Sequence, residues 1–169
     1  MEIRRTEPAD LDAVMDIYDR ARQYMKGHGN PNQWIDGYPS RELILEDIEN
    51  SNSYVCITEG ETVAVFSYIF GTDPTYLKIY GGSWLNDERY GVIHRIASIS
   101  HQKGVASYCI DWCFRQCCNI RIDTHEDNYI MQNLLVKNGF IRCGTIYLLS
   151  GASRIAYQKT EKSGPVHLH

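Results

Sequence analysis

Apolar and polar residues follow two different periods along this chain, and the two periods predict helices and strands. An apolar residue recurs every three or four positions, as on one face of a helix, in the segments 8–25, 40–49, 104–117 and 127–138. Short runs rich in β-branched and aromatic residues predict strands at 3–5, 54–58, 62–70, 90–98, 120–124, 140–143 and 155–158. We therefore expect one mixed α/β (α+β) domain over residues 1–160 and a loose tail at 161–169.

Polar and glycine residues mark several boundaries between these elements. Thr6 or Asp10 is expected to cap the first helix, and Ser40 the second. Glu59-Gly60-Glu61 joins two of the strands as a hairpin turn. Residues 71–86 follow neither period and receive no assignment.

The turn between the strand at 90–98 and the next helix carries the strongest chemical signal. Here the chain contains Lys103-Gly104-Val105 at the start of a helix. The N–H groups in the first turn of a helix lack partners within it, and the helix dipole favours an anion there. Gly104 has no Cβ, so a ligand can approach the backbone closely. The turn predicts a site for a phosphate-bearing cofactor, with an ordinary glycine-containing helix start as the alternative.

Length and composition limit the kinds of protein that this chain can be. With 169 residues, 43% of them hydrophobic and 22% charged, it can bury a core without metal or disulfide support. Its net charge of -4 and lack of a long Lys/Arg run argue against a nucleic-acid-binding surface. No stretch approaches the roughly 20 apolar residues that cross a bilayer, and no apolar signal region begins the chain. We expect a cytoplasmic protein with neither nucleic acid nor membrane as a partner.

The six cysteines raise the alternative of a metal or redox site. Cys109, Cys113 and Cys117 recur every four residues and, with Ala106 and Ile110, complete the apolar stripe of one predicted helix. No C-x-x-C pair is present to support zinc. We expect buried thiols that pack as small hydrophobes and no metal site. A Cys/His metal or redox protein is the alternative that the cysteine count alone suggests.

Two motifs and the order of the elements resemble a known family. The turn is His101-Gln102-Lys103-Gly104-Val105-Ala106, against a family pattern of Gln or Arg, two residues, Gly, one residue, and Gly or Ala. His101 departs from the first position of that pattern but leaves the backbone donors in place. Asn128 leads a helix that ends in Gly-Phe at Phe140. With the element order over residues 1–158, these motifs resemble the GNAT acetyltransferase superfamily. The resemblance implies a mixed, mostly antiparallel central sheet flanked by helices.

The resemblance also implies acetyl-coenzyme A as co-substrate and a set of residues that bind it. In the family the turn binds the pyrophosphate, and the preceding strand pairs with the pantetheine arm, near the Asn-led helix. The corresponding residues in this chain are Ile96, Ala97, Ser98, His101, Gln102, Lys103, Gly104, Val105, Ala106 and Asn128. The implied activity is N-acetyl transfer to a primary amine of a small molecule or a protein N-terminus. A non-catalytic acyl-coenzyme A binding module is the alternative.

Two residues are candidates for the general base that accepts the proton of the amine. Regular strand alternation places His94 on one face with Val92 and Ile96, so His94 could point to the acetyl site. An unperturbed histidine titrates near neutral pH, which suits a base, although a structural histidine is an equally good interpretation.

By resemblance, Asp123 matches a position where some relatives place a catalytic carboxylate, five residues before Asn128. The alternative for Asp123 is an ion pair or helix cap near Arg121 or His125.

The proton donor and the acceptor pocket are less determined. Many family members carry a tyrosine seven residues after the Asn, where this chain has Leu135, so either Tyr147 or no dedicated acid serves. Trp34, Tyr38 and Trp84 lie in loops that shape the acceptor pocket in relatives, although they equally suit loop anchors. The acceptor and the oligomeric state are left open, with a homodimer among the options.

Overall fold

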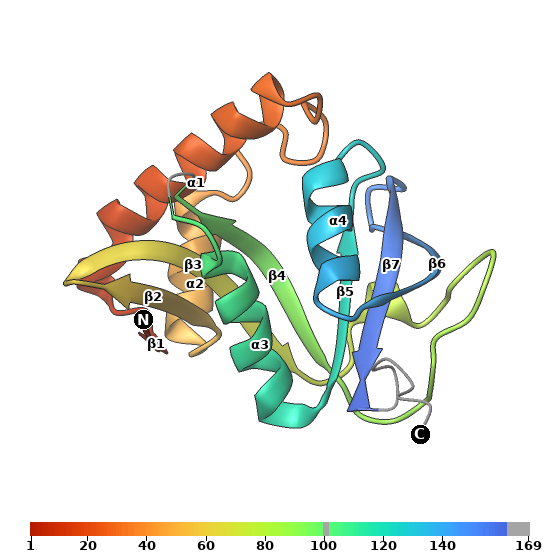
Figure 1. The fold of residues 1–169 in the computed structure, drawn as a ribbon. Coiled ribbons are helices and arrows are strands. Elements are labelled where there is room, and N and C mark those ends of the chain that lie inside the picture. The colour runs from red at the N-terminus through yellow and green to blue at the C-terminus, as the bar shows by residue number, and fades with distance from the viewer. Residues whose placement is uncertain (100–101, 162–169) are drawn as a thin grey trace. The chain divides into compact units, whose positions relative to one another are not determined.

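The computed structural model of the protein describes residues 1–99 and 102–161 (Figure 1). The strands are β1 (Glu2–Arg5), β2 (Ser53–Thr58), β3 (Glu61–Phe70), β4 (Gly91–Ser98), β5 (Asn119–Thr124), β6 (Ile141–Tyr147) and β7 (Ser153–Thr160). The helices are α1 (Leu11–Gly27), α2 (Arg41–Glu49), α3 (Val105–Cys117) and α4 (Tyr129–Lys137), with 3-10 turns η1 (Pro8–Asp10) and η2 (Pro74–Tyr76). Every predicted helix and strand is therefore present, with shifted ends. The expected tail lies outside the described residues from 162 onward.

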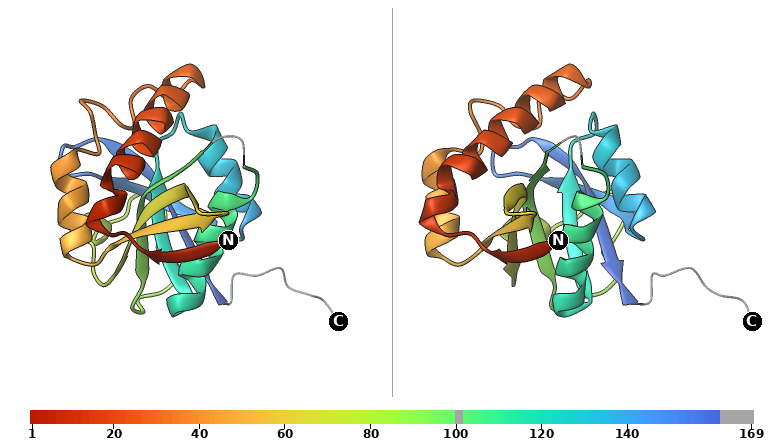
Figure 2. Two further views of the ribbon diagram at one scale, coloured as in Figure 1. Left: turned by 90° about the vertical axis from the view of Figure 1, so that its left-hand side faces the viewer. Right: turned by 60° about the vertical axis from the view of Figure 1, so that its left-hand side comes forward.

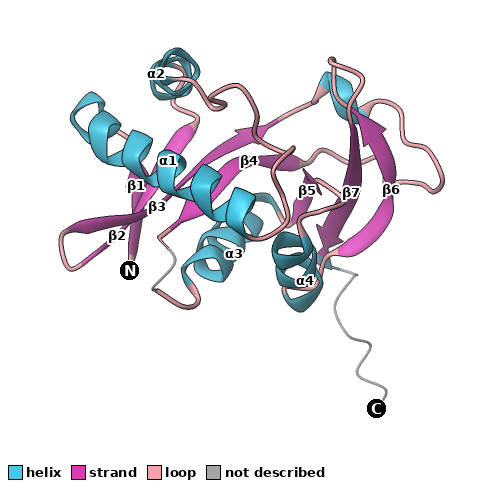
Figure 3. Ribbon diagram, turned by 90° about the horizontal axis from the view of Figure 1, so that it is seen from above, coloured by secondary structure: helices cyan, strands magenta, loops and turns pink. Residues whose placement is uncertain are grey.

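The strands pair in the order β1-β2-β3-β4-β5-β7-β6 (Figure 3). β4 and β5 are parallel, whereas β1 with β2, β2 with β3, β5 with β7 and β6 with β7 are antiparallel. This mixed, mostly antiparallel sheet with helices confirms the predicted fold class. The chain forms two compact units, residues 1–69 with 93–110, and residues 70–92 with those from 111 onward. The expectation of a single domain over 1–160 stays a prediction.

The first unit packs α1 and α2 on one face of β1 to β3 (Figure 2). Its core is made of fully buried side chains from both helices and from the β2–β3 hairpin, among them Val14, Ile44, Val55 and Phe66. Burial of one such side chain stabilises the fold by about 1.5–3 kcal/mol. The spacing of apolar residues in each segment therefore decides which face of the helix or strand packs in the core.

The two predicted helix starts have different outcomes. The Ser40 hydroxyl accepts the Leu43 N–H at 3.1 Å, which confirms Ser40 as the cap of α2. Asp10 precedes α1 but makes no cap bond to that helix; its carboxylate accepts the N–H of Glu7, the cap of η1, at 2.7 Å. Thr6 instead shares a hydrogen bond of 2.7 Å with the Ser53 hydroxyl. Asp10, one of the two predicted residues, therefore occupies the N-cap position of α1 without a capping side-chain bond, and Thr6 does not cap the helix.

Strand β4 leaves extended geometry at Arg95, whose φ is +53°. The Tyr18 hydroxyl of α1 donates to the Arg95 carbonyl at 2.8 Å. The Arg95 guanidinium donates to the Asp47 carboxylate of α2 at 2.6 and 2.8 Å, and to the Tyr38 hydroxyl at 3.2 Å. The predicted regular alternation along 90–98 is wrong at this residue, because a positive φ is not extended backbone.

The second unit places α4 on one face of β5, β7 and β6, and the segment 70–90 on the other face (Figures 1 and 3). The latter face holds a buried cluster of Tyr76, Tyr90, Val92, Ile146 and Ala156. The segment carries little regular structure, so its own aromatic side chains attach it to the sheet. This explains why no period appears between 71 and 86.

A buried cation lies within that cluster. The Arg121 guanidinium carbon lies 4.3 Å from the Trp84 ring centroid and 4.0 Å from that of Tyr90, and one of its nitrogens donates to the Asn86 carbonyl at 2.8 Å. Burial lowers the pKa of Arg121. The two aromatic faces offset part of the desolvation cost, since a cation over an aromatic ring contributes about 0.5–2 kcal/mol.

The cysteines have the environment that their spacing predicts. Cys109 and Cys113 of α3 are fully buried, Cys117 is half-buried, and all six cysteines are free thiols. Burial raises the pKa of both Cys56 and Cys109, which makes these thiols weak nucleophiles. Within residues 1–99 and 102–161, no group of His, Cys, Asp and Glu side chains could hold a metal ion. Over the same residues, no helix combines the length and apolar character that a membrane span needs.

The buried ion pair at Arg95 leads to a prediction about stability. Asp47→Ala should lower the free energy of unfolding by about 3–5 kcal/mol, because it leaves the Arg95 charge buried without its partner. Urea unfolding followed by circular dichroism measures the change. The control is Asp12→Ala, which removes a 90% exposed side chain paired with Arg41 and should cost less than about 1 kcal/mol. Equal losses in the two variants would contradict the structural importance of the Asp47–Arg95 pair.

Candidate active site

The glycine turn opens α3 directly after β4, within the first unit. The Ile99 N–H donates to the Val63 carbonyl at 3.0 Å, so the chain stays paired with β3 up to the turn. Gly104 is exposed with φ +82°, and a Cβ added there would meet nothing within 4 Å. Val105 next to it is buried and anchors the start of the helix. The turn therefore presents open backbone at a helix N-terminus, where an anionic group can accept hydrogen bonds.

The described residues among the predicted cofactor-binding positions of the first unit lie at the end of β4, at 96–98, and at the start of α3, at 102–106. Lys103 and Gly104 are exposed, Ala97 and Val105 are buried, and the others described are half-buried: Ile96, Ser98, Gln102 and Ala106. His101 lies outside the described residues.

His94 lies on β4, immediately before the break at Arg95, and its side chain is half-buried. Because the backbone turns at Arg95, the faces of His94 and Ile96 cannot be equated by counting residues. His94 belongs to the first unit, whereas Asp123 belongs to the second. The assignment of His94 as a base stays a prediction.

Asp123 lies on β5 in the second unit, with a buried tyrosine as its partner. The Tyr76 hydroxyl of η2 donates to the Asp123 carboxylate at 2.6 Å. Burial, with the negative charge of Asp123 beside it, raises the pKa of Tyr76 well above its usual value, so the hydroxyl keeps its proton. Sequence reasoning had considered Arg121 and His125 as partners and missed Tyr76. Nothing near Tyr76 in the sequence marks this contact, because 47 residues separate the pair.

Three further predicted positions lie in the second unit. The Asn128 side chain caps α4 by accepting the Met131 N–H at 3.0 Å, so it leads the helix as predicted. Leu135, where relatives carry a tyrosine, is fully buried in the core. Tyr147, the alternative proton donor, is 47% exposed at the end of β6 and packs edge-on against Tyr80. The Leu135 side chain therefore serves core packing, while Tyr147 is partly exposed to solvent.

The loop aromatics act mainly as anchors. Trp84 donates its indole N–H to the Tyr76 carbonyl at 2.9 Å in the second unit. Tyr38 accepts a hydrogen bond from Arg95, and Trp34 is buried against the Tyr18 ring in the first unit. This favours the anchoring interpretation of the three residues over direct contact with an acceptor.

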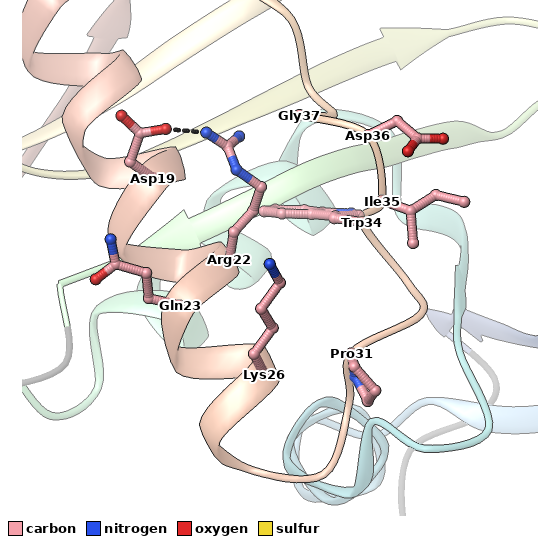
Figure 4. Close-up of a pocket in the computed structure, with 9 residues that line it drawn as sticks. All are labelled: Asp19, Arg22, Gln23, Lys26, Pro31, Trp34, Ile35, Asp36 and Gly37. Carbon is pink, nitrogen blue, oxygen red and sulfur yellow. Dashed lines mark hydrogen bonds and ion pairs between the residues drawn. The ribbon is translucent and has the colours of Figure 1, made fainter.

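A recess of about 600 Å³ lies between the C-terminal half of α1 and the loop that follows it (Figure 4). The Trp34 ring forms part of its wall, and the Lys26 side chain extends from α1 toward the loop (Figure 4). Arg22 is held by Asp19 and by the Tyr38 carbonyl, at 3.2 Å from the latter. Both charge signs are present in the lining, because Asp36 lies on the loop side.

Comparison with solved structures identifies the family. The chain is similar to a GNAT-family acetyltransferase from Streptococcus agalactiae 2603, at 35% sequence identity over 95% of each chain, with a TM-score of 0.87. The chain belongs to the GNAT family of acetyltransferases. The predicted family and its fold are thereby confirmed. No model of a protein family and no curated protein sequence matches the chain.

More distant GNAT structures share the fold alone. A ribosomal-protein-alanine N-acetyltransferase from Brucella melitensis is 19% identical over 95% of this chain and 99% of its own, with a TM-score of 0.64. A GNAT-like decarboxylase, GphF, in complex with isobutyryl-CoA is 13% identical over 95% of this chain and 99% of its own, with a TM-score of 0.66. One GNAT fold thus serves different reactions, and the acceptor has to be argued from this chain's own residues.

Proposed function

We propose that this GNAT protein is an N-acetyltransferase that uses acetyl-coenzyme A and acts on a primary amine of a small molecule or a protein N-terminus. The observation that carries the proposal is the turn at Gly104, whose open backbone begins α3 immediately after β4. Its features fit the pyrophosphate of coenzyme A: a glycine at φ +82°, free space where a Cβ would be, and a buried anchor at Val105. The chemistry that acetyl-coenzyme A supplies is an acetyl group in a reactive thioester.

The residues that hold the co-substrate follow from this position. Backbone N–H groups of residues 102–106 bind the pyrophosphate, each favourable placement at a helix N-terminus contributing about 0.3–1 kcal/mol. The backbone of Ile96 to Ser98 pairs with the pantetheine arm, as an added strand does. Asn128, whose side-chain oxygen caps α4, is included as a residue of the pantetheine arm on the family resemblance.

The higher the pKa of the acceptor amine, the more the reaction depends on a general base to remove its proton. Bringing a lysine-like amine of pKa about 10.4 to its neutral form at pH 7 costs roughly 4–5 kcal/mol, whereas an α-amine near pKa 8 needs only about 1 kcal/mol. His94 and Asp123 are the two candidates to accept that proton, directly or through water. A primary amine of a small molecule therefore depends on them more than a protein N-terminus does.

The alternative is a GNAT protein that binds acyl-coenzyme A without catalysing transfer. Leu135 is the observation in its favour, because the position of the family's tyrosine is filled by a fully buried aliphatic side chain. In the leading proposal, either Tyr147 donates the proton to the departing thiolate or the thiolate leaves without a dedicated acid. Release of free coenzyme A in a screen of amines and N-terminal peptides separates the two functions.

Acetyl-coenzyme A should raise the melting temperature of the protein. It contacts the native turn and not the unfolded chain, so a concentration 100 times its Kd should add about 2.7 kcal/mol to the free energy of unfolding. Differential scanning fluorimetry with and without acetyl-coenzyme A measures the shift, with free acetate as the control ligand. A melting temperature that does not change at saturating concentration would remove the proposal.

Gly104→Val should weaken the binding of acetyl-coenzyme A at least about tenfold, because the new side chain both disfavours φ +82° and projects from the open backbone. Isothermal titration calorimetry gives the affinity. The matched control is Gly60→Val in the β2–β3 turn, since Gly60 has φ +78° and equally open space but lies in a hairpin. Similar affinity in the two variants would show that the turn at Gly104 is not the cofactor site.

His94→Ala or Asp123→Asn, whichever removes the base, should reduce turnover by about 10² to 10⁴ at neutral pH and leave the affinity for acetyl-coenzyme A nearly unchanged. The defect should shrink at high pH, because more of the amine is then neutral. Steady-state kinetics between pH 6 and 10 test this, with circular dichroism to check folding. A uniform loss at every pH in both variants would assign these residues to structure.

A further inference from the structure

We infer that Tyr76 is a positioning residue for the Asp123 carboxylate, holding it in one orientation and in its ionised form for proton transfer from the acceptor amine. This inference rests on the proposed function, in which Asp123 is one of the two candidate bases. It adds a residue of η2 to the catalytic apparatus, although Tyr76 itself touches no substrate.

The contact between the two side chains is short and partly buried. The Tyr76 hydroxyl donates to an oxygen of Asp123 at 2.6 Å, within the range of charge-assisted O–H···O⁻ hydrogen bonds. Tyr76 is 1% exposed, whereas Asp123 at the end of β5 is half-buried. The donor is thus shielded from solvent, while Asp123 keeps partial exposure.

Packing alone would not require a hydroxyl at this position. The Tyr76 ring packs against Trp84 at a centroid distance of 5.3 Å and against Tyr90 at 6.3 Å. A phenylalanine ring would make the same contacts without a polar atom to bury. The hydroxyl is therefore placed for its bond to Asp123, because burying a polar group without such a partner is costly.

Several charged or titratable groups lie around the pair and enter its pH dependence. Asp73 and Tyr90 belong to the covering segment, Arg121 lies on the same face of β5, and Arg154 lies on β7 beside Ala156, which pairs with Asp123. His125 follows β5 by one residue. Arg121 is the buried cation of this face.

Hydrogen bonds around the η2 turn fix the position of Tyr76 relative to β5. Asp73 caps η2 by accepting the Thr75 N–H at 2.8 Å, and the Asp73 N–H donates to the Tyr90 hydroxyl at 3.0 Å. The Tyr76 carbonyl accepts the Trp84 indole N–H. Both sides of Tyr76 are thereby fixed, so its hydroxyl has little freedom to leave Asp123.

Tyr76→Phe tests the inference. Turnover should fall about tenfold, and the acidic limb of kcat/KM against pH should move up by about one pH unit, because the ionised carboxylate loses a donor. The KM for acetyl-coenzyme A should not change. The control is Tyr157→Phe, which removes the hydroxyl of another buried tyrosine of the second unit. Tyr157 is in register with Ile122, on the sheet face opposite Asp123, so the pH profile of this variant should match the unmodified protein.

A second variant keeps the test decisive if Tyr76→Phe folds poorly. Site-specific replacement of Tyr76 by 3-fluorotyrosine retains the ring and the hydroxyl but makes a stronger donor, so the acidic limb should move to lower pH. A profile that stays unchanged in both variants, while Asp123→Asn is strongly impaired, overturns the role of Tyr76 and leaves the proposed function intact. Full turnover in Asp123→Asn overturns this inference together with Asp123 as the base, and a protein that releases no coenzyme A with any amine contradicts the proposed function itself.

Discussion

The first unit depends on a buried ion pair that holds a strand in an unfavourable backbone conformation. A non-glycine residue with positive φ costs on the order of 1–3 kcal/mol, and Arg95 adopts it in the middle of β4. The bonds from Tyr18 and Asp47 to the Arg95 backbone and guanidinium offset that cost, and they come from α1 and α2. Strand and helices therefore stabilise each other, and the strand that leads to the Gly104 turn takes a direction that regular alternation would not give.

In the second unit, aromatic and polar side chains attach an irregular segment to the sheet, where strand pairing would otherwise do so. The segment 70–90 has a single 3-10 turn, yet it covers one face of β5 and β7. Gln158 accepts the Leu85 N–H at 2.8 Å, and Trp84 lies over the guanidinium of Arg121. These contacts tie irregular backbone to the sheet, and the same face carries Asp123. The proposed base thus lies where a polar group can be both held by the protein and reached from outside.

Function in a GNAT protein depends on details that the fold does not determine. This chain shares its fold with transferases and with a decarboxylase, so the fold alone leaves the reaction open. Leu135, at the position where the family resemblance implies a tyrosine, is fully buried, and Tyr147 elsewhere in the second unit is partly exposed. In the proposed function, the pKa of the acceptor amine decides how much a general base at His94 or Asp123 would contribute.

Local patterns in the sequence determined much of this protein. The periods of helices and strands, the Ser40 cap, the Asn128 helix start, the buried Cys109 stripe and the glycine turn at Gly104 could all be predicted, because each depends on neighbours within one or two turns. The same reasoning failed at Arg95 and at Asp123. Their partners lie far away in sequence, Tyr18 at 77 residues from the first and Tyr76 at 47 from the second. Only the tertiary structure decides such contacts, because the packing of α1 on the sheet and of the irregular segment on β5 brings together side chains that no local period connects.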